Sequence, residues 1–272
     1  MLPLLDDLLE AFPSYLGLPL GLTKTKIADF LPMVNRCERR LVSTSLFLSQ
    51  ARKLQMVNSV FSSLPTFIMG TFQLHVTIRE QVDKYRKHYL WCGNDENDRI
   101  NAKAAWPLVA RPKINGGLGV IDLKTHNEAL LLKQLDKFFN RADIPQVQLV
   151  WEKHYSNGKL PNQSKKGSFW WRDVLKLLDK FKGMPSVSAA DGASCLLWND
   201  CWAWQPLKLK FPELHSFAKN PNLTLKIARS FDSFTSLFNL HLFVEVYGQM
   251  IIFQNTLESL APIDENDTWS YI

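Results

Sequence analysis

Apolar residues recur at helical spacing through the first third of the chain. The spacing predicts a helix over residues 25–42, a second over about 45–63 that Pro65 ends or kinks, and a third over about 76–91 that stops at Cys92-Gly93-Asn94. The first helix has an apolar face within an arc of about 100°, formed by Ile27, Phe30, Leu31, Val34 and Leu41. The predicted apolar face of the second helix consists of Leu54, Val57, Phe61 and Leu64. The predicted apolar face of the third helix consists of Ile78, Val82, Tyr85 and Tyr89.

A connector is predicted over residues 94–122. Three Gly and one Pro fall within Pro112–Gly119, which favours tight turns over a helix. The next helix is predicted to open with Thr125-x-x-Glu128, the spacing of a capping box. Its core face continues through Leu131, Leu132, Leu135, Phe138 and Phe139. Further helices are predicted over residues 145–155, 168–182, 211–218 and 242–260.

The pattern changes after Gly183. Val187–Trp202, with Asp191-Gly192 in the middle, predicts a β-hairpin closed by a tight turn. The fold class is therefore mostly α with a small β-hairpin element. The breaks in pattern divide the chain into three predicted parts, 1–93, 94–160 and 161–272.

Composition indicates a globular chain with a mild positive balance. The 32 Lys and Arg exceed the 26 Asp and Glu by a net charge of +6, which is compatible with nucleic acid or an anionic membrane surface but not diagnostic of either. Nine Trp and 17 Phe suit a packed interior, and they would also suit stacking on bases.

No targeting or spanning segment is recognisable. The four cysteines form no disulfide framework, and the amino-terminal residues lack the pattern of a signal peptide. The richest apolar stretch, Phe234–Phe253, is interrupted by polar residues and is too broken for a transmembrane helix. We therefore expect an intracellular protein, in the nucleus or cytoplasm, without a membrane partner.

Motifs for catalysis or metal binding are weak. Asp6-Asp7 forms an acidic pair, but Leu4 stands where reverse transcriptases carry an aromatic residue before their Asp-Asp turn. Cys195-x5-Cys201 followed by His215 lacks a second ligand pair for zinc. The chain contains neither a P-loop nor a Gly-x-Ser-x-Gly elbow. We predict no catalytic residue, metal site, cofactor or small-molecule ligand.

Basic residues lie on the polar sides of the predicted helices. Between residues 1 and 91, 11 Lys and Arg stand against 7 Asp and Glu. Such residues usually form a solvated face, but they can also contact backbone phosphates of RNA or DNA. The candidate contacts are Lys24, Lys26, Arg36, Arg39, Arg40, Arg52, Lys53, Arg86, Lys87 and Lys113.

An ordered series of sequence blocks resembles the region that follows the catalytic palm in plant LINE-type (non-LTR retrotransposon) reverse transcriptases. The blocks are Tyr15–Gly21, Phe30-Leu31-Pro32, Arg39-Arg40-Leu41, Leu48–Val60, Leu64–Phe67, Trp91-Cys92-Gly93, Ala104-Ala105-Trp106, Pro112–Val120 and Asn127–Leu131. The resemblance is clear over about residues 12–160. At the end of the chain, Asp267–Ile272 resembles the opening of the family's zinc-binding-type carboxy-terminal domain.

The resemblance implies a thumb-like helical module at about 25–91 that grips a template–primer duplex, followed by a connector and a helical region. The family's aromatic-x-Asp-Asp motif and its Cys/His ligands have no counterpart in this sequence. We therefore expect a non-catalytic fragment with weak, sequence-independent affinity for nucleic acid. The alternatives are an RNA-directed DNA polymerase whose front end is missing from the gene model, an inert pseudogene product, and a protein-interaction module.

Overall fold

The computed structural model describes residues 14–15, 18–19, 24–42, 48–92, 102–155, 160–161, 167–239, 241–259 and 265–271. The described parts are mostly helical with short strands, which confirms the predicted fold class. Contacts divide the chain into two compact units, Met1–Leu131 and Leu132–Ile272. The boundary falls inside helix α7, Leu123–Phe139. The predicted three-part division stays a prediction.

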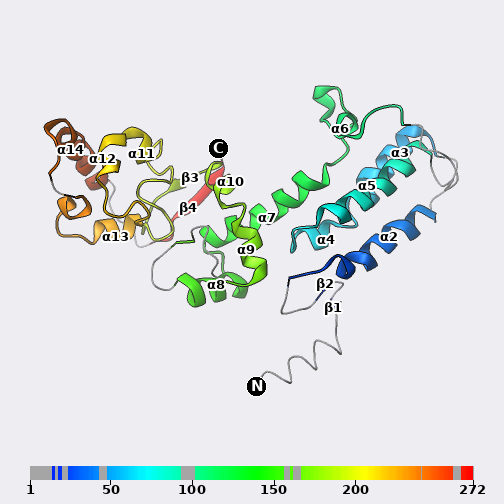
Figure 1. The fold of residues 1–272 in the computed structure, drawn as a ribbon, viewed down its shortest axis with the longest axis horizontal. Coiled ribbons are helices and arrows are strands. Elements are labelled where there is room, and N and C mark those ends of the chain that lie inside the picture. The colour runs from blue at the N-terminus through cyan, green and yellow to red at the C-terminus, as the bar shows by residue number, and fades with distance from the viewer. Residues whose placement is uncertain are drawn as a thin grey trace, which may run out of the picture. The chain divides into compact units, whose positions relative to one another are not determined.

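Unit 1 is a set of helices preceded by a short antiparallel pair (Figure 1). The pair is β1 (Ser14–Tyr15) with β2 (Leu18–Pro19). A 3-10 turn over Ile27–Phe30 leads into α2 (Leu31–Val42), and the chain continues through α3 (Gln50–Met56), a π-helical turn (Val57–Phe61), α4 (Thr66–Met69), α5 (Val76–Trp91), α6 (Trp106–Val109), a 3-10 turn (Lys113–Asn115) and the start of α7.

The buried face of α2 differs from the predicted one. Phe30 and Val34 are buried as predicted, but Ile27 and Leu31 are 41% and 42% exposed. Met33 and Cys37 are buried in their place and pack toward α4 and α5. The 3-10 turn before α2 has about 3.0 residues per turn instead of 3.6, so it shifts Ile27 out of phase with the helix. For Leu41 the structure describes the backbone alone, so the burial of its side chain stays a prediction.

Two apolar clusters form the core of unit 1. One joins α2 to α4, α5 and Leu123 of α7. The other joins Val57 and Phe61 of the π-helical turn to Tyr89 and Leu90 of α5, with residues of the connector beside them. The predicted faces of the second and third helices are therefore confirmed in their central positions.

The connector makes the tight turns that its glycines predicted. Gly116 and Gly119 have positive φ angles of 77° and 70°. A Cβ atom on Gly117 would lie 2.1 Å from the backbone oxygen of Arg111, so only glycine fits there. The following helix, α7, begins earlier than predicted: the carboxylate of Asp122 accepts the backbone N–H of Thr125 at 2.8 Å and caps the helix. The predicted capping box at Thr125 is wrong by one turn.

Unit 2 contains short helices and one small sheet (Figure 1). Its elements are the end of α7, α8 (Pro145–Tyr155), α9 (Phe169–Leu175), α10 (Leu178–Lys182), β3 (Pro185–Ser188), α11 (Leu207–Lys210), α12 (Pro212–Ser216), α13 (Leu225–Arg229), a 3-10 turn (Phe234–Leu237), α14 (Val244–Glu258) and β4 (Thr268–Tyr271). Aromatic rings fill its core: Phe139 stacks on Phe181 at 5.3 Å and contacts Trp269 at 4.8 Å.

The predicted β-hairpin over 187–202 is wrong. Strand β3 pairs instead with β4, in antiparallel register from Pro185 opposite Tyr271 to Ser188 opposite Thr268. Residues Asp191-Gly192 do form a turn, with Gly192 at φ 73°, but the turn does not close a local ladder. Because β4 is distant in sequence, a local pattern could not reveal it as the partner.

Candidate nucleic-acid interface

Three of the candidate residues lie on one helix. Arg36, Arg39 and Arg40 of α2 are exposed, whereas Met33 and Val34 are buried on its other side. Side chains three and four residues apart on a helix are neighbours, with Cβ atoms about 5–6 Å apart. The helix therefore presents an arginine face, defined as Arg36, Arg39 and Arg40, away from the core of unit 1.

Other candidates come from separate elements of unit 1. Lys24 and Lys26 are exposed before the 3-10 turn that leads into α2. Arg52 is exposed on α3, and the neighbouring Lys53 is half-buried. Lys113 is exposed in the connector, and its methylene groups cover Gly119. The structure thus gathers three candidates on α2 and distributes these five over three segments.

Arg86 must be removed from the candidate contacts. Its side chain is 0% exposed and forms an ion pair with Asp83 at 2.6 Å. It also donates to the hydroxyl of Ser62 at 2.9 Å and to the carbonyl of Ile121 at 2.6 Å. Burial lowers the pKa of the guanidinium, and burial raises the pKa of Asp83 although Arg86 opposes that rise. Arg86 is a structural cation that ties α5 to the preceding turn and the connector.

Lys87 is half-buried beside the connector. Its ammonium group lies 5.6 Å from the centroid of the Trp106 ring, and the Arg86 guanidinium lies 5.4 Å from the same ring. The indole therefore occupies part of the surface of Lys87. Arg86 and Lys87 thus both contact the Trp106 ring, and on the arginine face the Nε–H of Arg39 donates to the carbonyl of Asn35 at 3.4 Å.

The charge balance of unit 1 favours an anionic partner. Its described residues include fifteen Lys and Arg against six Asp and Glu. Exposed cations that were not among the candidates are Lys84, Lys103, Arg111 and Lys124. Lys103, Arg111 and Lys124 lie beyond residue 91, outside the segment in which basic residues were counted. A positive field over unit 1 would attract a polyanion.

Metal sites in proteins are built from clustered side chains such as His, Cys, Asp and Glu, and the described ranges contain all four residue types. Within those ranges no three or more His, Cys, Asp or Glu side chains gather as a metal site would require. Asp6-Asp7 lies outside the described residues. The cysteines are free thiols: burial raises the pKa of Cys37 to about 11 and raises that of Cys195 well above its usual value. The helices described include none that could cross a membrane.

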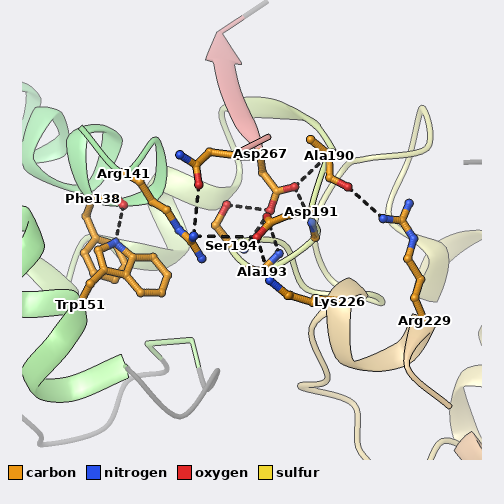
Figure 2. A network of polar contacts seen from close by, with 12 residues as sticks. Phe138, Arg141, Trp151, Ala190, Asp191, Ala193, Ser194, Lys226, Arg229 and Asp267 are labelled. Atoms are coloured by element: carbon orange, nitrogen blue, oxygen red, sulfur yellow. Dashed lines mark hydrogen bonds and ion pairs between the residues drawn. The ribbon is translucent and has the colours of Figure 1, made fainter. Parts of the chain in front are cut away.

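Unit 2 contains a polar network that the sequence did not predict (Figure 2). The buried carboxylate of Asp267 accepts the backbone N–H groups of Ala190, Gly192 and Ser194, each at 2.8 Å. The Ser194 hydroxyl donates to the same carboxylate at 3.0 Å. Asp267 thereby ties the last described segment, 265–271, to the rest of unit 2.

Trp204 of unit 2 differs from the other eight tryptophans of the chain. Trp204 is 102% exposed, and its φ angle is 63°. The N–H of Gln205 donates to the carbonyl of Ala203 at 2.7 Å, so Trp204 is the central residue of a three-residue turn. The sequence is rich in Trp, but it carries no signal that singles out this residue.

Two proteins of Arabidopsis thaliana are similar to the chain. One, described as "Putative ribonuclease H protein", is 29% identical over 161 residues, which are 57% of this chain and 26% of that protein. The other, described as "Uncharacterized mitochondrial protein", is 24% identical over 143 residues, which are 52% of this chain and 92% of that protein. The chain spans about a quarter of the length of the first relative. No family model matches the chain, and no solved structure matches it.

Proposed function

We propose that the chain is a transposon-related, non-catalytic segment that holds a nucleic-acid duplex through its backbone phosphates. The observation that carries the proposal is the arginine face of α2, exposed opposite a buried apolar side. Similarity to a plant protein described as a ribonuclease H protein supports nucleic acid as the class of ligand. In the finer form of the proposal, unit 1 is the thumb of a plant LINE-type reverse transcriptase.

Arginine suits this role because its planar guanidinium stays charged and can donate two parallel hydrogen bonds to one phosphate. The face offers three such groups on adjacent turns of one helix. Contacts to phosphates position a duplex without reading its bases, so binding would be independent of sequence. The exposed candidates Lys24, Lys26, Arg52 and Lys113 and the half-buried Lys53 would extend the phosphate contacts. Lys87 would contribute less because it lies beside Trp106.

The proposal predicts the salt dependence of binding. Each phosphate contact adds about 0.9 to the slope of log K against log salt on a duplex, so three arginines contribute a slope of about 3. Replacing Arg36, Arg39 and Arg40 by Gln should reduce the slope by about that amount. Fluorescence anisotropy with an RNA–DNA hybrid of about 20 base pairs would measure both the affinity and the slope.

A matched control removes the same charge elsewhere. Lys133 and Lys137 on α7 and Lys153 on α8 are exposed residues of unit 2, and their joint replacement by Gln lowers the net charge equally. We expect this control to keep most of the salt slope. Equal losses in the two triple variants, or a wild-type affinity that does not change with salt, would show that the arginine face does not bind the duplex.

A further inference from the structure

Trp204 is held in a conformation that costs free energy. A bulky residue with positive φ is rare, and a three-residue turn with positive φ at its centre is strained. The indole gains no burial in return, because it is exposed to solvent. All nine tryptophans lie in described parts of the chain, and the other eight are buried or half-buried. Strain of this kind persists where the surroundings impose it, and it often marks a functional position.

The sequence segment that contains Trp204 is basic. From Cys201 to Pro212 the sequence contains Lys208 and Lys210 and no acidic residue. Both lysines are oriented by neighbours: the Lys208 ammonium group donates to Asn199 at 2.9 Å, and the Lys210 ammonium group lies 5.2 Å from the centroid of the Phe211 ring. Nearby Asp200 is buried and already paired with Lys182 at 2.6 Å.

A cleft in unit 2 includes Pro206, two residues after Trp204 in sequence, in its wall. It has a volume of about 730 Å³, and Pro206, Lys208, Lys182, Asn199 and Asn222 contribute to its wall. Clefts of about 300–1,000 Å³ are the size that binds small ligands. The wall combines two ammonium groups and two side-chain amides with one carboxylate, that of Asp179. Ammonium groups can contact phosphates, and amides can contact base edges.

We propose that Trp204 is a stacking platform for a base of single-stranded nucleic acid, with Lys208 and Lys210 contacting the adjoining phosphates. An exposed aromatic ring beside cations is the arrangement that binds single strands without sequence preference. A duplex offers no unstacked base to an indole, so this site would not bind the interior of a duplex. The inference lies beyond the proposed function, with which it shares only the class of ligand.

Binding to single strands of about 12 nucleotides, oligo(dT) and oligo(U), tests the proposal by fluorescence anisotropy at low salt. Stacking of one base on an aromatic ring strengthens binding by about 5- to 150-fold, so Trp204→Leu should weaken binding by about tenfold or more. Trp204→Phe keeps a ring and should stay within about threefold of wild type. Tyr247→Leu removes another exposed aromatic of unit 2, one with no lysine within 20 residues in sequence, and should change nothing.

Trp204→Gly separates binding from folding. Glycine adopts positive φ without strain, so this variant should melt about 2–4 °C higher than wild type while it binds single strands as weakly as Trp204→Leu. Lys208→Gln and Lys210→Gln should each reduce the salt slope on single strands by about 0.7.

The duplex probe distinguishes this inference from the proposed function. Loss of single-strand affinity in Trp204→Leu with unchanged duplex affinity supports the stacking platform. If wild type binds the single strand and not the duplex, the platform stands and the duplex proposal fails. Unchanged single-strand affinity in Trp204→Leu, or no single-strand binding by wild type, overturns the platform. Loss of self-association in that variant would then assign the indole to a protein contact.

Discussion

Replacement of Arg86 by Met tests the assignment of this residue to the protein interior. The variant removes a guanidinium that is completely buried and leaves an apolar side chain of similar length. Asp83 loses its ion-pair partner, and Ser62 and Ile121 lose a donor each. Removing one member of a buried ion pair costs about 3–5 kcal/mol because the other charge stays buried without compensation. Since the Asp83 side chain keeps 20% exposure, we expect about 3 kcal/mol.

The cost should depend on pH. Burial raises the pKa of Asp83 above its usual value, and the charge of Arg86 opposes that rise. Without Arg86 the folded-state pKa rises further. A carboxyl with a raised folded pKa contributes stability that is present below its unfolded pKa of about 3.9 and is lost as pH rises through the folded value. The difference between variant and wild type should therefore be largest near pH 7 and shrink toward pH 4.

Urea denaturation followed by circular dichroism at pH 7 and pH 4 would measure the difference. Lys87→Met is the matched control, because it removes the next cation of α5, which is half-buried, and should cost less than about 1 kcal/mol. Replacing both Asp83 and Arg86 by apolar residues should recover part of the loss. A cost below about 1 kcal/mol at pH 7, or a cost that does not change with pH, would refute the reasoning.

Three further substitutions test local packing and hydrogen bonding within each unit. Gly117→Ala places a Cβ atom 2.1 Å from the Arg111 backbone oxygen and should lower stability by about 2 kcal/mol or more; a neutral result in urea denaturation would contradict the turn. Gly248→Ala on α14 adds a Cβ atom that would meet nothing within 4 Å beyond its own helix backbone, so it should raise stability by about 1 kcal/mol, and a loss there would show an undetected contact. Asp267→Asn turns one acceptor of the Ser194 N–H into a donor and should cost about 2 kcal/mol, observable as a lower urea midpoint; an unchanged midpoint would exclude a stabilising role.

Local patterns located several helices and their core faces. The predicted bounds 76–91 and 145–155 agree with α5 and α8, and all five predicted core positions of α7 are buried. Each of these predictions depends on apolar side chains three or four residues apart, and such neighbours meet on one helix face whatever the rest of the chain does.

Long-range partners account for the failures. The turn at Asp191-Gly192 was recognisable, but the carboxylate that binds it belongs to Asp267. Arg86 looked like a surface cation because its hydrogen-bond partners Ser62 and Ile121 are distant in sequence. The single local signal for its burial was Asp83, three residues earlier, at a spacing that allows an ion pair. Trp204 had no sequence signal, since its exposure follows from the backbone conformation.

The pairing of β3 with β4 determines when unit 2 can fold during synthesis. Strand β3 ends at Ser188 and β4 begins at Thr268, so the ribosome must add the whole intervening segment before the sheet can form. At about 5–20 residues per second this takes roughly 4–16 s. Until then Phe139 and Phe181 lack the indole of Trp269, which contacts both rings in the folded unit. The nascent chain therefore passes through a period in which these rings are incompletely covered and available to chaperones.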